Sequence, residues 1–372
     1  MKIVSVMTTA AEGGAEFAAM EMLWALKQRG HDPVMLTDLP AIGRDTGVRL
    51  RHVELGPKLS GRDWLSVGAR WPLYLWRLRK ALEAEAPYDV LLVHYKKEQL
   101  MARQLPKRLR PALVWAEWGP VPVQMRQGPG AWVYRDAARR AGKIMAISAG
   151  TKESVVEMGA DPEKVEVVPN VMRGDELAYS DEGRQRVRRQ LGVPEDAFLV
   201  GLISRFHPKK RNDVVVEAVK LLDQRAHILL AGAGETEEQL RELAAPLDGR
   251  AHFVRTPGDD VADYTSAFDI GVFAPSPAEG APRAVILAWL ASRTCLSTGA
   301  MGVADMITDG IGEIIAPEND PAALAGALRR YMDDPERLAR EGAAARDRAI
   351  STYDAPVVAE RIERLFREAG AQ

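Results

Sequence analysis

Residues 272–298 hold the most informative combination of side chains in this chain, because a single carboxylate stands between two apolar runs. The run before it, residues 269–274, is typical of a buried strand, and the run after it, residues 284–291, of a buried helix. The proline-rich loop between them carries Glu279. A helix that begins at a glycine offers unpaired backbone N–H groups to a phosphate, and a carboxylate beside it can accept hydrogen bonds from hydroxyls. A phosphate next to a polyol describes a sugar nucleotide.

A second candidate anion site is the basic stretch RFHPKKRND, residues 205–213. It follows an apolar run, residues 198–204, that predicts a strand, and it precedes a run with helical spacing. Basic side chains at a strand's carboxyl end and a helix start favour an anion clamp. The alternative is a solvated loop.

Glycines stand between the first predicted strand, residues 2–7, and the first predicted helix, residues 17–29. Gly13 and Gly14 would let the backbone approach a phosphate or a sugar closely. A tight turn without a ligand is the alternative for this pair.

A histidine follows another predicted strand, residues 88–93, at its carboxyl end. That is where α/β enzymes place functional side chains. His94 is therefore a candidate site residue, with a purely structural histidine as the alternative.

The composition bounds the class of protein. The chain has 372 residues, 47% of them apolar and 27% charged, with a net charge of −2, which predicts two ordinary globular domains and no nucleic-acid partner. The only cysteine, Cys295, lies in an apolar run and is expected in the core. We see no signal peptide and no run of about 20 apolar residues, so a soluble, cytoplasmic protein is expected.

Strand and helix patterns alternate along both halves of the chain. Composition turns polar over residues 173–195, which marks a linker, and the alternation restarts at residue 198. We predict one domain over residues 1–172 and a second over residues 173–351. Residues 338–367 are expected to be helical.

Residues 62–86 predict an amphipathic helix packed on the first domain. Its tryptophans Trp64 and Trp76 and its basic side chains admit a second interpretation, an interfacial helix on an anionic membrane. In that case residues 62–80 would make a peripheral contact at the inner face of the membrane.

The stretch PSPAEGAPRAVILAWLAS, residues 275–292, resembles the donor-site motif of the GT4-type retaining glycosyltransferases of the GT-B fold. In that family two glutamates separated by seven residues flank the loop. The first is Glu279 here, but the second position is Leu287, and a leucine cannot grip ribose hydroxyls. Residues 13–37, near the start of the chain, are also similar to the family. Residues 165–171 are similar as well, with Val171 in place of a glycine. The resemblance covers nearly the whole chain in the same order.

The resemblance implies two Rossmann-like, doubly wound parallel-sheet domains that face a cleft. The first would receive the acceptor and the second the nucleotide-sugar donor, and a last helix, about residues 352–372, would cross back to the first domain. It also implies catalytic roles for four residues, namely His94, Glu279, Arg205 and Lys210. The implied donor-binding residues are Gly13, Gly14, Arg205, Lys210, Gly232, Gly234, Glu279, Gly280, Ala281, Pro282, Arg283 and Leu287. The acceptor candidates are Tyr95, Glu117 and Trp118.

The expected reaction is transfer of a sugar from a nucleotide sugar to an acceptor hydroxyl, with the retention that the family implies. No two aspartates stand two residues apart, so we predict no metal site and no further cofactor. The acceptor is expected to be a small molecule or a lipid-linked glycan. Two alternatives stay open, a non-catalytic partner that binds nucleotide or glycan, which Leu287 favours, and a sugar-nucleotide 2-epimerase.

Overall fold

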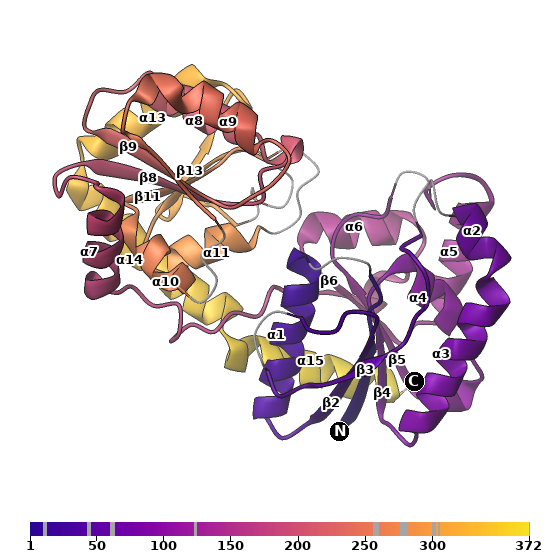
Figure 1. Ribbon diagram of the computed structural model, residues 1–372. Helices are drawn as coiled ribbons and strands as arrows, with labels where there is room; N and C mark the ends of the chain where they lie inside the picture. The colour runs from indigo at the N-terminus through magenta and orange to yellow at the C-terminus, as the bar shows by residue number, and fades with distance from the viewer. Residues whose placement is uncertain are drawn as a thin grey trace. The chain divides into compact units, whose positions relative to one another are not determined.

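The chain forms two compact units in the computed structural model, which describes residues 1–9, 13–42, 46–59, 64–122, 125–255, 260–275, 282–299, 303 and 306–371. Unit 1 comprises residues 1–172 and 355–372, and unit 2 comprises residues 173–354. The sequence predicts a domain boundary after residue 172 and a return of the chain to the first domain at about residue 352. Each unit is a parallel β-sheet with helices on both faces (Figure 1). The expected pair of Rossmann-like folds is confirmed.

Unit 1 contains a seven-stranded sheet in the order β3-β2-β1-β4-β5-β6-β7. Every pairing in it is parallel. The central strands are buried on both faces, so they appear in the sequence as continuous apolar runs. The strands are β1 (Lys2–Val6), β2 (Asp32–Thr37), β3 (Arg49–His52), β4 (Val90–Val93), β5 (Ala112–Glu117), β6 (Lys143–Ala146) and β7 (Val165–Val167).

Two apolar cores cover the two faces of this sheet. Alternate residues of β1 and the residue after it divide between them, since Val4 and Val6 join one core while Ile3 and Met7 join the other. One core contains side chains of α3, α4, α5 and α6, and the other contains side chains of α1 and α15. The helices of unit 1 are α1 (Gly14–Gln28), α2 (Trp64–Ala69), α3 (Trp71–Glu85), α4 (Lys96–Ala102), α5 (Gly128–Arg139), α6 (Ala149–Glu157) and α15 (Ala355–Gly370).

Unit 2 contains a six-stranded parallel sheet in the order β10-β9-β8-β11-β12-β13. In Figure 1, α8, α9 and α13 lie on one face of it, and α7, α10, α11 and α14 on the other. The strands are β8 (Phe198–Ile203), β9 (Ala226–Ala231), β10 (Ala251–Val254), β11 (Ile270–Phe273), β12 (Cys295–Thr298) and β13 (Gly312–Ile315). The helices are α7 (Asp181–Leu191), α8 (Asn212–Lys220), α9 (Glu237–Ala244), α10 (Val261–Ala267), α11 (Arg283–Leu290), α13 (Pro321–Met332) and α14 (Pro335–Tyr353). Cys295 is fully buried in β12, as expected of a core residue.

Each sheet reverses its strand order at one place. In unit 1 the first strand, β1, lies between β2 and β4, and in unit 2 the first strand, β8, lies between β9 and β11. The connections on the two sides of such a strand run in opposite directions and leave a crevice at the carboxyl ends of the strands, where α/β proteins bind ligands. Ser5 and His94 belong to this place in unit 1, and Arg205 belongs to it in unit 2.

The prediction of a single helix over residues 62–86 is wrong in one respect, because the helix is interrupted at Arg70 and forms α2 and α3. Pro72 lies in the first turn of α3, where its missing N–H is tolerated, whereas in the middle of a helix it would remove a hydrogen bond. Among the described residues, no helix has the length and apolar character needed to cross a bilayer.

The helical region near the end of the chain is also divided. Asp354 has extended backbone angles and ends α14, and its carboxylate accepts a hydrogen bond from the Gly174 N–H at 3.0 Å. The next helix, α15, packs on α1 within unit 1, where Glu363 pairs with Arg29 at 2.6 Å. The last helix therefore belongs to the first unit.

Candidate functional site

His94 lies just past the end of β4, at the place where the strand order of unit 1 reverses. Only 2% of the residue is exposed. The Trp118 indole N–H donates to His94 Nδ1 at 3.2 Å, and His94 Nε2 lies 2.7 Å from Ser5 Oγ. Because Nδ1 accepts, the proton of the neutral ring is on Nε2, which donates to Ser5. Both ring nitrogens are thus engaged within unit 1.

Burial lowers the pKa of His94 to about 3, because the cationic ring would lose its hydration. The imidazole is therefore neutral in the folded protein at neutral pH. Its role in this geometry is to hold the Trp118 indole, whose ring plane lies within 10° of its own.

We expect the folded state to lose stability as the pH falls from 7 to 5, because unfolding frees His94 to take up a proton near its ordinary pKa. The folded-state pKa is depressed, so the stabilisation is complete above pH 6.5 and declines as the pH falls toward 3. At pH 5 the loss from this group is about 2 kcal/mol. Urea unfolding at both pH values measures it, and His94→Gln should show a smaller difference between them. An unchanged difference in that variant would contradict the assignment.

Glu117, an acceptor candidate, is the last residue of β5 and is buried. Its carboxylate pairs with Lys96, and the Tyr134 hydroxyl donates to it at 3.1 Å. Burial lowers the pKa of Lys96, and the Glu117 charge opposes that shift. These contacts give Glu117 the role of neutralising the Lys96 ammonium.

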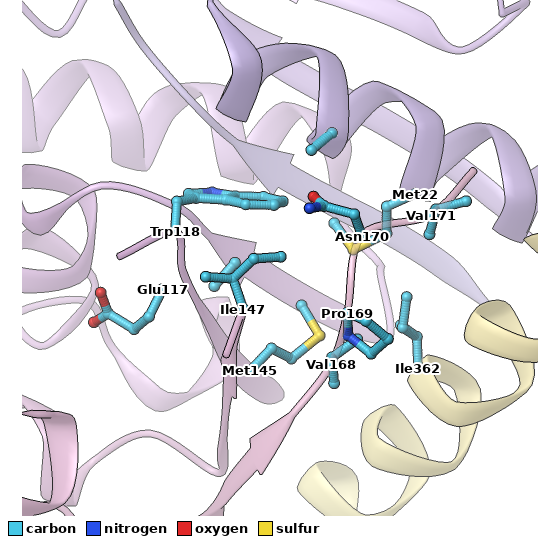
Figure 2. A pocket seen from close by; sticks show the side chains of 12 residues that line it. Met22, Glu117, Trp118, Met145, Ile147, Val168, Pro169, Asn170, Val171 and Ile362 are labelled. Atoms are coloured by element: carbon cyan, nitrogen blue, oxygen red, sulfur yellow. The ribbon is translucent and has the colours of Figure 1, made fainter. Parts of the chain in front are cut away.

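A small pocket lies beside Trp118 in unit 1, lined by residues of β5, β6, α1, α15 and the segment after β7. Figure 2 shows the Trp118 ring and the Asn170 side chain on the same side of this pocket, with the Glu117 carboxylate pointing away from Asn170. Its volume is about 20 Å³, which is room for about one water molecule. The pocket alone is therefore too small for a sugar.

Tyr95, the other acceptor candidate, belongs to a three-residue network with Glu16 and Lys58. Its hydroxyl donates to Glu16 Oε1, and Lys58 Nζ lies 2.9 Å from that hydroxyl and 3.1 Å from Glu16 Oε1. The Lys58 ammonium also lies 4.0 Å from the centre of the Tyr95 ring. Neither Glu16 nor Lys58 was among the site residues expected from the sequence, although Glu16 lies within the family-like residues 13–37.

Two fully buried charged residues of α4 complete this edge of unit 1 and were also missed. The Glu98 carboxylate accepts from the Thr8 N–H at 3.2 Å and from the Thr8 hydroxyl at 2.5 Å. Burial raises the pKa of Glu98 and lowers that of Lys97. Lys97 donates to the backbone oxygens of Gly56 and Pro57 and so holds the segment that carries Lys58. The short sequence KKE after the His94-Tyr95 pair was the available signal.

Gly13 and Gly14, the glycine pair expected near a ligand, have different surroundings. Gly13 caps α1 with an extended backbone, and a Cβ there would lie 3.2 Å from Glu16 Oε2. Gly14 is the first residue of α1, and a Cβ there would meet no described atom within 4 Å. The backbone angles of Gly13 do not require a glycine, so open space at the helix start is the feature that the pair provides.

The basic loop of unit 2 lies at the carboxyl end of β8, beside the switch point. Arg205 is exposed, and no described side chain forms an ion pair or a hydrogen bond with its guanidinium. Lys210 ends a short 3₁₀ helix, Pro208–Lys210, and is half-buried. Arg211 has φ +46° and pairs with Asp213, which turns the chain into α8. Arg205 and Lys210 thus lie in the loop that joins β8 to α8.

Gly232 and Gly234 follow β9 and are required by a close approach of this loop. A Cβ on Gly232 would lie 1.9 Å from the backbone oxygen of Ser204, and one on Gly234 would lie 2.2 Å from that of Phe206. The Phe206 N–H donates to the Ala233 carbonyl at 2.9 Å. The two glycines therefore hold the backbone around Arg205, whichever ligand binds there.

The donor motif is described only in its second part. Pro282 caps α11, Arg283 is its first residue, and Leu287 is half-buried one turn later. Glu279, Gly280 and Ala281 lie outside the described residues. Among the residues that the structure describes, no three histidine, cysteine or carboxylate side chains gather as a metal-binding group.

Two protein-family models match this chain in succession. The model described as "Glycosyl transferase 4-like domain" matches residues 13–171, and the model described as "Glycosyl transferases group 1" matches residues 197–334. The first match lies in unit 1 and the second in unit 2. Together they account for most of both units.

Two curated relatives of this chain carry the same name. The D-inositol 3-phosphate glycosyltransferase of Streptomyces scabiei is 29% identical over 340 residues, which covers 84% of this chain and 75% of the relative. The protein of the same name from Thermomonospora curvata is 27% identical over 371 residues, 90% of this chain and 85% of the relative.

Solved structures share the fold across the whole chain. Anabaena Alr3699/HepE in complex with UDP has a TM-score of 0.83 at 19% identity and covers 99% of this chain and 100% of its own. Sucrose-phosphate synthase from Thermosynechococcus elongatus has a TM-score of 0.81 at 18% identity and covers 100% of this chain and 99% of its own. With the two family models, these similarities show that the chain belongs to the GT4-like, group 1 glycosyltransferases of the GT-B fold.

Proposed function

We propose that this protein transfers a sugar from a nucleoside-diphosphate sugar to a hydroxyl of an acceptor, with retention and without a metal ion. The observation that carries the proposal is the basic turn at the carboxyl end of β8. Its Arg205 guanidinium is exposed and unpaired among the described residues, and Lys210 follows in the same loop. Both cations lie at the switch point of the sheet, where a diphosphate would bind.

A uridine nucleotide is the donor class that the comparisons favour. Structures of the same fold are described as complexes with UDP and with UDP-glucose. In this chain Arg205 and Lys210 would bind the diphosphate and stabilise the charge that develops on it as the glycosidic bond breaks. Glu279 would accept hydrogen bonds from sugar hydroxyls, and Arg283 would lie nearby. Leu287 offers no acceptor to the ribose, so we expect weaker ribose binding.

The contacts of His94 support a different role from the catalytic one that the family resemblance implies. Its two nitrogens are engaged by Trp118 and Ser5, so we infer that it positions Trp118 for the sugar or the acceptor and does not bind the sugar itself. Tyr95 stays an acceptor candidate together with its partners. Gly13 and Gly14 are proposed to leave room for a sugar at the start of α1.

Retention is proposed with a front-face displacement, because among the described residues we identify no second carboxylate suited to act as a nucleophile. Retaining glycosidases with such a nucleophile hold two carboxylates about 5–5.5 Å apart. The anomeric configuration of the product, determined by NMR, tests the proposal, and an inverted product would refute it.

The first experiment on the function is thermal unfolding with UDP, GDP, ADP, CDP and dTDP. We expect UDP to stabilise the protein, because a ligand present at 100 times its Kd adds about 2.7 kcal/mol to the folded state. A shift with another base would keep the transferase and change the donor. No shift with any nucleotide would favour the non-catalytic partner instead.

The exposed side chains of α3 bear on the acceptor and on a membrane contact. Leu73 and Trp76 on α3 are exposed, which supports contact with a lipid surface or a lipid-linked acceptor. The neighbouring Arg77 and Arg79 pair with Glu54 and Glu83, which weakens any attraction to anionic lipid. Flotation with anionic liposomes at low salt decides the question, and absence of binding would remove the membrane from the proposal.

A further inference from the structure

The Glu16 carboxylate occupies the point in unit 1 where two hydrogen-bond donors from other segments converge. Lys58 Nζ lies 3.1 Å from Glu16 Oε1, and the Tyr95 hydroxyl donates to the same oxygen. The Glu16 side chain is 2% exposed, whereas the Lys58 side chain is 44% exposed. Glu16 lies in the first turn of α1 and Tyr95 follows β4, so this network is at the carboxyl edge of the sheet.

The charges around the network leave Lys58 as the ammonium that a ligand would meet. Lys97 is fully buried and donates to backbone oxygens. The Asp38 and Glu98 carboxylates lie close enough to affect the ionisation of Tyr95 and Lys97. Among the described residues around Tyr95, three carboxylates thus face two ammonium groups.

An ammonium and a phenol directed at one oxygen atom form a pair that binds anions, since charge-assisted hydrogen bonds to an anionic oxygen are strong. In this chain the oxygen belongs to the protein itself. A phosphate brought to the same pair would meet the negative charge of Glu16, and displacing Glu16 would leave a buried carboxylate without its partners, which is costly.

We propose that Glu16 determines acceptor specificity, as a built-in anion that closes the Lys58–Tyr95 pair to phosphate. The acceptor of this enzyme then presents an uncharged hydroxyl group at this edge. This differs from the relatives, whose name specifies an inositol phosphate. The inference rests on the proposed function, in which the carboxyl edge of unit 1 receives the acceptor.

The test is a calorimetric titration of the full-length protein with inorganic phosphate at constant ionic strength, with UDP saturating so that a diphosphate site is filled. We expect the Glu16→Gln variant to bind phosphate at least about tenfold more tightly than the wild type, because the side chain keeps its size and loses its charge. Adding Lys58→Met should abolish the gain. A gain that persists without Lys58, or no gain at all, overturns the proposal.

Two further variants keep the test decisive. Lys58→Met in the wild-type background should leave phosphate binding unchanged, and a weakening there would show that the pair already binds anions, which overturns the proposal even if Glu16→Gln fails to fold. Glu157→Gln removes an exposed carboxylate of α6 and should change nothing. The nucleotide titration is read separately. Absence of stabilisation by any nucleotide counts against the transferase, whereas the dependence of phosphate binding on Glu16 and Lys58 judges this inference.

Discussion

Replacing Lys210 by alanine is expected to lower kcat by about 100-fold while folding is retained, because removing one preorganised group that stabilises transition-state charge costs about 10²–10³ in rate. Lys210 ends the 3₁₀ turn Pro208–Lys210, immediately before the start of α8. There its ammonium would lie beside the diphosphate as negative charge grows on the leaving group. Steady-state kinetics with a UDP-sugar measure the effect once an acceptor is known, and slow hydrolysis of the donor measures it before then.

The neighbouring lysine is the matched control for this prediction. Lys209 is exposed on the same turn, and its backbone N–H donates to His207 Nδ1, a contact that an alanine keeps. Lys209→Ala should therefore leave kcat nearly unchanged. If Lys210→Ala raises KM alone, the lysine binds the ground state and transition state equally, and its catalytic role is refuted.

The second large effect is expected from Gly232→Ala, which should destabilise unit 2 by about 3 kcal/mol, as overpacking against backbone does. The new methyl group would lie 1.9 Å from the Ser204 carbonyl oxygen and 3.2 Å from the Phe206 ring. The Ser204 N–H and the Phe206 N–H both donate to the end of β9 and the residues after it, so the loop cannot move without losing these hydrogen bonds. Urea unfolding measures the loss.

The same variant should also weaken stabilisation by UDP, because the displaced backbone carries Arg205. Gly326→Ala is the control within unit 2. Gly326 lies inside α13, where a Cβ would meet nothing within 4 Å, so alanine should stabilise the helix by about 0.5–1 kcal/mol. Equal stability and equal UDP binding for wild type and Gly232→Ala would contradict the close approach described above.

Most strands of both sheets could be predicted from the sequence, and the exceptions have a physical reason. β8 and β11 are buried on both faces and are continuous apolar runs, which a pattern reveals directly. β3 is an edge strand with the sequence RLRH, and its arginines pair with the buried Glu85. Charged edge strands avoid the apolar pattern because they must not pair with other chains.

The residues of the candidate site also differ in how far the sequence predicts which of them lie together. Arg205 and Lys210 lie within one short loop after a strand, and Gly232 and Gly234 within another, so the members of each pair are near one another along the chain. The network of Glu16, Lys58 and Tyr95 joins residues 42, 37 and 79 positions apart. No local pattern predicted that these three residues meet, because it is the strand order that brings their segments to one edge.

The sequence by itself determined the fold class, the two units and the family, because apolar periodicity and collinear motifs are properties of the chain. Only the tertiary structure decided what individual polar groups do. Burial made the His94 imidazole neutral, and Trp118 and Ser5 engage its two nitrogens. The placement of Glu16 against Lys58 neutralised the ammonium that an acceptor would meet. Hydrogen bonding and ionisation depend on distance and burial, which arise only when distant segments pack together.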